Sequence, residues 1–383
     1  MNYLILTCNT GGGHNSAAYA MQEYITSQGD NAVTLDFMKL KSERASRIVG
    51  GLYINMAKNT PKLFGFVYKL GAAISSPRRK SPVYFACKGM AKRLKAYLEE
   101  HPTDVIITTH LYPAETFAYM RKKDMLPQKT VAICTDYTCI PFWEETDCDY
   151  YILPHEGLRK EYVAHGVPDE KLISLGIPVK QDFTRHRDKA HIREKLHLPV
   201  ESPMFLVMSG SMGAGKLLVF AMHLAIKCKH GEHIVIICGT NDRIRKLLKK
   251  EFRWSRYVHL VGFTEHVSDY MDACDVLFTK PGGITSTEGL VKGIPMVHTA
   301  PIPGCETRNC QFFEERGMSV AGDSIKEQVE KGLQKAIDEN LWSKSHHYLI
   351  WHGRKVCHSQ KPDCANCTLC GICDYFKHKG KGR

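Results

Sequence analysis

The stretch YLILTCNTGGGHNSAA (residues 3–18) decides the fold. A short apolar run typical of a buried strand leads directly into three glycines and a histidine, and small residues that can open a helix follow. Glycines at a helix N-terminus leave backbone N–H groups bare for an anion or a closely approaching substrate. His14 can act there as a general base, since an unperturbed imidazole titrates near neutrality. The alternative is a tight strand-to-helix turn capped by the histidine.

The stretch MFLVMSGSMGAGK (residues 204–216) repeats the pattern of strand, glycine loop and helix. Gly210, Gly215 and Lys216 fit the spacing of a nucleotide-triphosphate P-loop, but Leu217 stands where that motif needs a hydroxyl to hold magnesium. We therefore reject a P-loop. The loop instead predicts a metal-free diphosphate site built on backbone N–H groups and the helix dipole.

Short apolar runs alternate with helical stretches through the first 330 residues. Ten of them are predicted strands: Tyr3–Cys8, Ala32–Phe37, Val105–Thr109, Thr130–Thr135, Tyr150–Leu153, Met204–Met208, His233–Cys238, Val258–Val261, Val276–Thr279 and Met296–His298. The alternation predicts an α/β protein with two parallel, doubly wound sheets covered by helices. Ligands of such sheets bind beyond the carboxyl ends of the strands, so the active site is expected in a cleft between two domains.

Two further loops follow predicted strands of the second half. In KPGGITSTEG (residues 280–289), Glu288 is expected in the first turns of a helix opened by Gly282 and Gly283, close enough to the cleft to accept from ribose hydroxyls. A carboxylate that merely complements the helix dipole is the alternative. The polar loop PIPGCETRN (residues 301–309) is the third loop in this half.

The net charge of the chain indicates which classes of partner it can bind. The formal charge of +12 favours an anionic one, which includes phosphate groups, an acidic membrane surface and nucleic acid. The first apolar run is far too short for a signal sequence or a membrane span, so we expect a cytoplasmic protein that does not cross the membrane. Residues 39–98 are rich in Lys and Arg and carry interleaved apolar residues. Such a segment can lie on an anionic membrane, although the same pattern more often belongs to an amphipathic helix that packs on the protein core.

Residues 1 to about 330 resemble the family of monogalactosyldiacylglycerol synthases and processive diacylglycerol glucosyltransferases. Five groups of residues carry the resemblance: Gly11-Gly-Gly-His14; Thr135-Asp136-Tyr137 with Trp143; Gly262-Phe263; Gly282-Gly-Ile-Thr-Ser-Thr-Glu288; and Pro303-Gly-Cys-Glu306-Thr-Arg-Asn309.

The resemblance implies the GT-B fold, with two Rossmann-like domains facing a cleft. It implies a lipid-acceptor domain at residues 1–180 on the membrane side, a UDP-sugar domain at 181–330, and a peripheral position on the inner face of the cell membrane. His14 and Asp136 are the implied candidates for the base. The implied ligand-binding residues are Gly12, Gly13, Ser209, Gly210, Ser211, Gly213, Phe263, Gly283, Thr285, Glu288, Glu306 and Asn309.

The expected function is transfer of a hexose from a UDP-sugar, with inversion, to a membrane diacylglycerol-type acceptor. One alternative is an N-acetylglucosaminyltransferase acting on a polyprenyl-linked acceptor. Two departures from the family pattern leave the base and the sugar open. No histidine stands between Asp136 and Trp143, and Cys305 replaces the glutamine that many relatives have before Glu306.

The tail, residues 331–383, resembles a different family. The run HGRKVC (residues 352–357) and the cysteine spacing match the 4Fe–4S cluster loop of endonuclease-III-type DNA glycosylases. The implied ligands are Cys357, Cys364, Cys367 and Cys373. Cys370 also allows a ferredoxin-like or zinc arrangement, and unmetallated cysteines are a further alternative. The non-enzyme alternative is therefore an iron–sulfur nucleic-acid-binding protein on a degenerate glycosyltransferase scaffold. We expect no base excision, because no glycosylase catalytic segment precedes the tail, and no nucleic-acid partner, because the basic C-terminus is more typical of a solvated end.

Overall fold

The computed structural model describes residues 1–76, 79–208, 217–228, 231–322 and 324–335. The chain divides into two compact units, Met1–Gly332 and Leu333–Arg383. The predicted cysteine-rich tail, with its four candidate cluster ligands, lies almost wholly outside the described residues. A boundary between residues 180 and 181, within the first unit, stays a prediction.

The first unit contains a six-stranded parallel sheet in its N-terminal half. Its strands are β1 (Asn2–Thr7), β2 (Asn31–Asp36), β3 (Val105–Thr108), β4 (Lys129–Ile133), β5 (Tyr150–Leu153) and β6 (Leu172–Ser174). They lie in the order β2-β1-β3-β4-β5-β6, with Tyr3 of β1 aligned with Ala32 on one side and Val105 on the other. The centre of β1, Leu4–Leu6, is buried on both faces, as strands of a helix-covered parallel sheet are.

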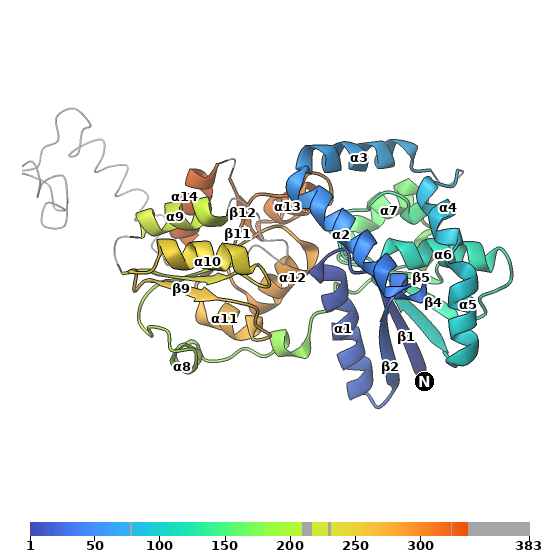
Figure 1. The fold of residues 1–383 in the computed structure, drawn as a ribbon, viewed down its shortest axis with the longest axis horizontal. Coiled ribbons are helices and arrows are strands. Elements are labelled where there is room, and N and C mark those ends of the chain that lie inside the picture. The colour runs from blue at the N-terminus through green and yellow to red at the C-terminus, as the bar shows by residue number, and fades with distance from the viewer. Residues whose placement is uncertain (77–78, 209–216, 229–230, 323, 336–383) are drawn as a thin grey trace, which may run out of the picture. The chain divides into compact units, whose positions relative to one another are not determined.

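A second parallel sheet follows in the C-terminal half. It contains β7 (Met204–Met208), β8 (His233–Ile237), β9 (Val258–Val261), β10 (Val276–Thr279), β11 (Met296–His298) and β12 (Val320–Ala321), in the order β12-β11-β10-β7-β8-β9. Helices α9 and α10 cover one face of this sheet, and α11 and α12 cover the other (Figure 1). The prediction of two doubly wound parallel sheets is therefore confirmed.

Helices connect the strands. The α-helices are α1 (Gly12–Ser27), α2 (Glu43–Asn59), α3 (Pro61–Ile74), α4 (Pro82–Lys88), α5 (Ala91–Glu100), α6 (Leu111–Arg121), α7 (Arg159–His165), α8 (Lys189–Lys195), α9 (Leu217–Lys227), α10 (Asp242–Glu251), α11 (Val267–Ala273), α12 (Gly283–Lys292), α13 (Cys305–Glu315) and α14 (Ile325–Lys335). Short 3-10 helices are η1 (Phe37–Leu40), η2 (Trp143–Glu145), η3 (Glu156–Leu158), η4 (Asp169–Lys171) and η5 (Gln181–Thr184). None of the helices in the described ranges is long and apolar enough to cross a bilayer.

Local sequence explains where several helices begin. Ser42 caps α2 because its hydroxyl accepts from the N–H of Ala45, and Ser81 caps α4 in the same way. Pro61 occupies the first position of α3, where its missing N–H costs nothing. The loop after β1, the loop before α12 and the loop before α13 each follow the carboxyl end of a strand, so the parallel topology gathers these polar segments at the carboxyl edges of the two sheets.

The segment between the sheets is fixed to the C-terminal half. Arg187 forms ion pairs with Asp182, Asp269 and Asp272, and the buried ammonium of Lys292 donates to Asp272 and to the carbonyl of Arg185. Buried charges are stable only when they are paired in this manner. Residues 182–187 therefore move with α11 and α12.

Candidate active site

His14 lies in the first turn of α1, at the carboxyl end of β1. Its Nδ1 is 2.7 Å from the carbonyl oxygen of Thr109 and 3.0 Å from the hydroxyl of Thr135. A carbonyl can only accept, so Nδ1 carries the hydrogen and Nε2 keeps its lone pair. Burial lowers the pKa of His14, and the neighbouring charge of Asp136 partly opposes that effect. The imidazole is therefore neutral at pH 7 and able to accept a proton at Nε2.

Asp136 follows β4 and is held by a residue of the other half. The amide Nδ2 of Asn309, in α13, donates to Oδ1 of Asp136 at 3.0 Å and to the carbonyl of Pro281 at 3.0 Å. The amide oxygen of Asn309 accepts from the N–H of Tyr137 at 2.7 Å. Asn309 is fully buried, so its amide links the β4 loop, the loop before α12 and α13.

Glycines bring the two halves into backbone contact at this point. A Cβ on Gly283, the first residue of α12, would lie 1.9 Å from the carbonyl oxygen of Thr135. A Cβ on Gly13 would meet the side chain of Ile284 at 3.4 Å, which is ordinary contact. Glycine at position 283 is thus required for the N-terminus of α12 to reach the β4 loop. The first N–H groups of that helix, near Thr285, have no partner within the helix and favour an anion.

Two acidic residues of the second half lie in low-polarity surroundings. Burial raises the pKa of Glu288, in α12, to about 8, while the charge of Lys180 opposes the shift. Burial also raises the pKa of Glu306, whose Oε2 accepts from the N–H of Ile302 at 2.7 Å. Clusters of shifted carboxyl groups of this kind are frequent at functional sites.

Of the remaining predicted ligand-binding residues, some are exposed and others lie outside the described residues. Phe263 lies in the loop after β9 with 70% of its side chain exposed, and Gly12 is also exposed. Ser209, Gly210, Ser211 and Gly213 lie outside the described residues. Cys357, Cys364, Cys367 and Cys373 do as well. Within the described ranges, no group of three or more His, Cys, Asp and Glu side chains could hold a metal ion.

Sequence reasoning missed that α2 and α3 cover this site. A Cβ on Gly50 of α2 would lie 2.2 Å from the backbone oxygen of Asn9, in the first glycine loop. A Cβ on Gly65 of α3 would lie 2.8 Å from Cβ of Pro303, in the third loop. Burial raises the pKa of Tyr53, in α2, and the neighbouring Asp136 and Glu306 are close enough to add to that shift. The signal in the sequence was a pair of glycines in otherwise amphipathic helices, each followed three residues later by a tyrosine.

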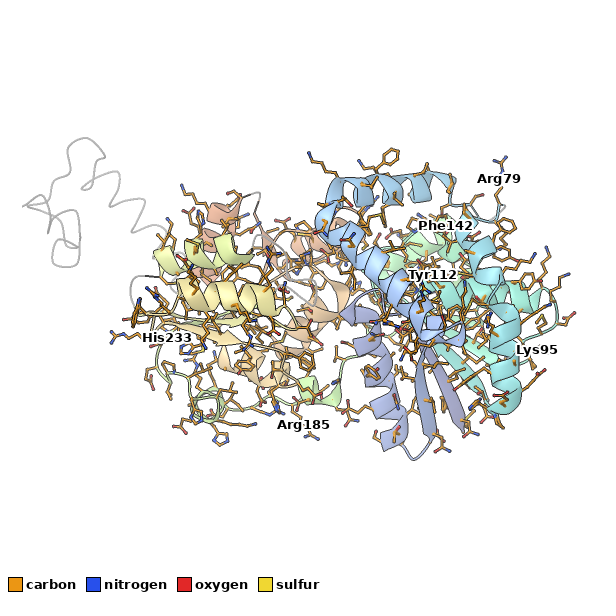
Figure 2. The ribbon with its side chains drawn as sticks, in the orientation of Figure 1. Arg79, Lys95, Tyr112, Phe142, Arg185 and His233 are labelled. Carbon is orange, nitrogen blue, oxygen red and sulfur yellow. The ribbon has the colours of Figure 1, made fainter. Side chains whose placement is uncertain are left out.

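A pocket of about 290 Å³ lies under the second half of α3. Figure 2 labels Phe142 below α3, and a Cβ on Gly71 of that helix would lie 3.4 Å from the Phe142 ring. The pocket is lined by Tyr68, Ala72, Ser75, Thr138, Cys139, Pro141, Glu144, Glu161, Ala164, His165 and Arg308. It was not predicted.

The sequence of this chain is similar to those of several known proteins. The family described as monogalactosyldiacylglycerol (MGDG) synthase matches residues 14–179. A protein named processive diacylglycerol beta-glucosyltransferase from Bacillus licheniformis is 28% identical, with 88% of this chain and 87% of that protein covered. Its namesake from Staphylococcus carnosus is 26% identical, with 88% and 85% covered.

Solved structures share the fold. The crystal structure of Acinetobacter baumannii MurG superposes with a TM-score of 0.56 at 13% identity and covers 86% of this chain and 89% of that one. The S. aureus MnaA structure with UDP superposes with a TM-score of 0.55 at 11% identity, covering 94% and 98%. The predicted GT-B fold is confirmed.

Proposed function

We propose that this chain, a hexosyltransferase similar to monogalactosyldiacylglycerol synthases and processive diacylglycerol glucosyltransferases, transfers a hexose from a UDP-sugar, with inversion, to a diacylglycerol-type membrane lipid. The observation that carries the proposal is the neutral His14, whose Nε2 can accept a proton beside Asp136 and the N-terminus of α12.

In the proposed reaction, the acceptor hydroxyl attacks the anomeric carbon of the sugar. Nε2 of His14 takes the hydroxyl proton, and Asp136 stabilises the imidazolium that forms. The bond between the anomeric carbon and the phosphate oxygen breaks, and UDP leaves with the electron pair. The N–H groups at the N-terminus of α12 support the developing negative charge. Glu288 holds the ribose, and Glu306 faces the sugar.

The donor is proposed to be a UDP-sugar on two grounds. The glycine loops and the start of α12 offer N–H groups for a diphosphate, and the S. aureus relative in fold was solved with UDP. The loop after β9, with its exposed Phe263, is the proposed contact of the uracil ring. Ser209, Gly210, Ser211 and Gly213 complete the proposed diphosphate site.

The acceptor is proposed to reach the enzyme from a membrane surface. The outer face of α3 exposes large apolar side chains, namely Leu63, Phe66, Val67, Leu70 and Ile74. Lys62 and Lys69 are exposed on the same helix. Figure 2 shows Arg79 just beyond the end of α3, with its side chain pointing outward. Apolar residues flanked by cations fit the interface of a bilayer that contains anionic lipids.

Two measurements on the full chain test the proposed base. His14→Ala should lower kcat for lipid glycosylation about 10²–10⁴-fold, the usual contribution of a general base. It should leave the calorimetric Kd for UDP within about twofold, because His14 acts on the acceptor. Exposed His223 of α9 supplies the matched control, His223→Ala, which should change neither quantity. Unchanged turnover in His14→Ala would remove His14 from the role of base.

A further inference from the structure

We propose that His110 is a positioning residue for the proposed base: its ring holds both the first glycine loop and the imidazole of His14 in the arrangement from which Nε2 of His14 takes a proton. The inference rests on the proposed function, because it adds a residue to the same reaction centre. His110 lies between β3 and α6, outside the groups of residues that carry the family resemblance.

Two hydrogen bonds fix where the proton of His110 lies. Its Nδ1 accepts from the N–H of Tyr112 at 3.2 Å, so this nitrogen carries no hydrogen. Nε2 therefore carries the hydrogen and donates it to the hydroxyl of Thr10 at 3.0 Å. An imidazole with an accepting Nδ1 is uncharged. Burial, to which the neighbouring His14 adds, lowers the pKa of His110 well below its usual range, in agreement with this geometry.

The bond to Thr10 restrains the first glycine loop. Thr10 directly precedes Gly11, Gly12 and Gly13, and both Thr10 and His110 are buried. The N–H of Thr10 also donates to the carbonyl of Cys8 at 2.8 Å. Glycines have wide conformational freedom, so the path of the chain from β1 into α1 depends on the residue that is held before them. That path decides where the backbone of His14 lies.

The ring of His110 packs against the ring of His14. The two ring centroids are 4.7 Å apart, and the planes are inclined by 71°, which is an edge-to-face contact. Thr109 holds the same histidine from the backbone, because its carbonyl lies 2.7 Å from Nδ1 of His14 and its hydroxyl donates to the carbonyl of His14 at 3.0 Å. Residues 109 and 110 thus restrain the backbone, Nδ1 and one side of the ring of the proposed base.

The uncharged state of His110 favours the proton transfer. A charged imidazole beside His14 would oppose the imidazolium that forms when His14 takes the proton of the acceptor. The other titratable side chains near this pair are Cys8, Tyr53, Tyr112 and Asp136. Burial raises the pKa of the first three, so they are uncharged at neutral pH. The charge among them that acts on His14 is therefore that of Asp136.

His110 also caps α6 through its bond to the N–H of Tyr112, so the test must separate the cap from the positioning of His14. His110→Asn keeps an acceptor near the place of Nδ1, and asparagine is a strong N-cap residue. It is too short to reach Thr10 and removes the ring from His14. His110→Gln does the opposite, because its amide reaches the place of Nε2 and can donate to Thr10, while the cap is weakened.

The first measurement is lipid glycosylation by the full chain, with labelled UDP-glucose and diacylglycerol in mixed micelles. His110→Asn should keep the wild-type Tm but lower kcat about tenfold to a hundredfold, as a misplaced catalytic group does. KM for the lipid and the calorimetric Kd for UDP should stay within about twofold, because the base acts in the transition state. His110→Gln should lower Tm but retain more of kcat than His110→Asn.

A pH profile gives a reading that a helix cap would not change. Burial is the main cause that lowers the pKa of His14. The smaller side chain of His110→Asn admits water to the ring of His14, so the acid limb of kcat should move to higher pH. An unmoved limb together with a wild-type kcat would reduce His110 to a helix cap and overturn the inference.

Thr10 offers a second test that leaves the cap of α6 intact. Thr10→Val keeps the size of the side chain but removes the hydroxyl that accepts from His110, and it should lower kcat in the same direction as His110→Asn. Thr10→Ser restores the hydroxyl and should return kcat to within about twofold of the wild type. If His110→Asn does not fold, these two variants decide, and equal kcat in both would overturn the inference.

His155 supplies the matched control. Its Nδ1 accepts from the N–H of Gly157 at 2.9 Å, so it too caps a helix, but its ring packs against Phe312 instead of His14. His155→Asn should change neither kcat nor the acid limb.

The outcomes also separate this inference from the proposed function. If the wild type labels diacylglycerol and His14→Ala does not, while His110→Asn and Thr10→Val match the wild type, the inference fails and the proposed function stands. A wild type that labels no lipid would overturn both.

Discussion

His14 is the residue on which the proposed chemistry depends, and its surroundings set the pH at which it works. The Thr109 carbonyl fixes the proton on Nδ1, and burial lowers the pKa of the imidazole. A base with a lowered pKa stays unprotonated, and so active, to a lower pH than an exposed histidine. The acid limb of kcat should accordingly lie below pH 6.5.

The charge of Asp136 leads to a second prediction about the pH dependence. Asp136 raises the pKa of His14, so Asp136→Asn should move the acid limb to still lower pH while reducing kcat through loss of imidazolium stabilisation. The measurement is a pH profile of kcat for wild type and variant. Asp136 would be the base instead if Asp136→Asn abolished activity and the acid limb of the wild type did not lie below pH 6.5.

Glu115 provides a stability test that is independent of catalysis. It is fully buried in α6, and burial, together with the neighbouring carboxylate of Glu145, raises its pKa to about 10. Because the folded-state pKa is above the unfolded value, protonation of Glu115 favours the folded state. This contribution to stability is fully present at low pH. Stability declines as the pH rises through the interval from 4.5 toward about 10.

Glu115→Gln should relieve that decline, because the amide stays neutral at every pH in this interval. The gain in Tm over wild type should grow between about pH 5 and pH 9. Exposed Glu99 of α5 supplies the control, Glu99→Gln, for which no such growth is expected. A gain that does not change with pH would show that Glu115 holds no proton in the folded state.

At the scale of elements, the approach of α12 to the β4 loop depends on one glycine. Gly283→Ala would place a Cβ 1.9 Å from the Thr135 carbonyl, so either the helix or the loop must shift. We expect a loss of about 1–3 kcal/mol in the free energy of unfolding, which is typical of overpacking, and a weaker UDP affinity.

The adjacent glycine is the control for this prediction. A Cβ on Gly282 would meet nothing within 4 Å, and its φ of −75° suits any residue. Gly282→Ala should therefore retain stability within about 0.5 kcal/mol, as ordinary surface substitutions do. Equal stability of the two variants in urea unfolding would refute the close contact.

The exposed apolar residues of α3 are predicted to contact the membrane. The double variant Phe66→Glu with Leu70→Glu replaces two exposed apolar residues with carboxylates and should reduce sedimentation with vesicles of phosphatidylglycerol and phosphatidylcholine at least fivefold. Leu175→Glu changes a residue that is 74% exposed in the loop after β6 and should not alter binding. Equal vesicle binding by both variants would place the membrane contact elsewhere.

The elements show what the sequence could predict and what it could not. All ten expected strands are present, because each is a continuous apolar run that ends at a turn signal. Strands β6 (Leu172–Ser174) and β12 (Val320–Ala321) were missed, since three and two residues at a sheet edge carry no readable pattern.

The site was predicted in part for a similar reason. Parallel topology alone brings the glycine loops to the strand ends, but the cover formed by α2 and α3 depends on long-range contacts at Gly50 and Gly65. The prediction that Asn309 faces the sugar or its phosphates did not include its bonds to Asp136, Tyr137 and Pro281. The bonds to Asp136 and Tyr137 join segments 173 and 172 residues apart in sequence, which local patterns cannot reveal.

For the whole molecule, we propose that the two sheets serve different substrates. The N-terminal half supplies His14, Asp136 and α3, the proposed membrane contact, while the C-terminal half supplies α12 and the carboxyl groups proposed to meet the donor. The amide of Asn309 joins the two halves beside the reaction centre.

The most direct test is transfer itself. The full chain should be incubated with vesicles that contain either diacylglycerol or a polyprenyl-linked acceptor, in separate reactions with labelled UDP-glucose, UDP-galactose or UDP-N-acetylglucosamine, and the lipid extract should be counted. We predict lipid-soluble label from a UDP-hexose, with the configuration at the anomeric carbon inverted, and its loss in His14→Ala. Label from UDP-N-acetylglucosamine on a polyprenyl acceptor alone, or no lipid label from any donor in folded protein that binds UDP, would contradict the account.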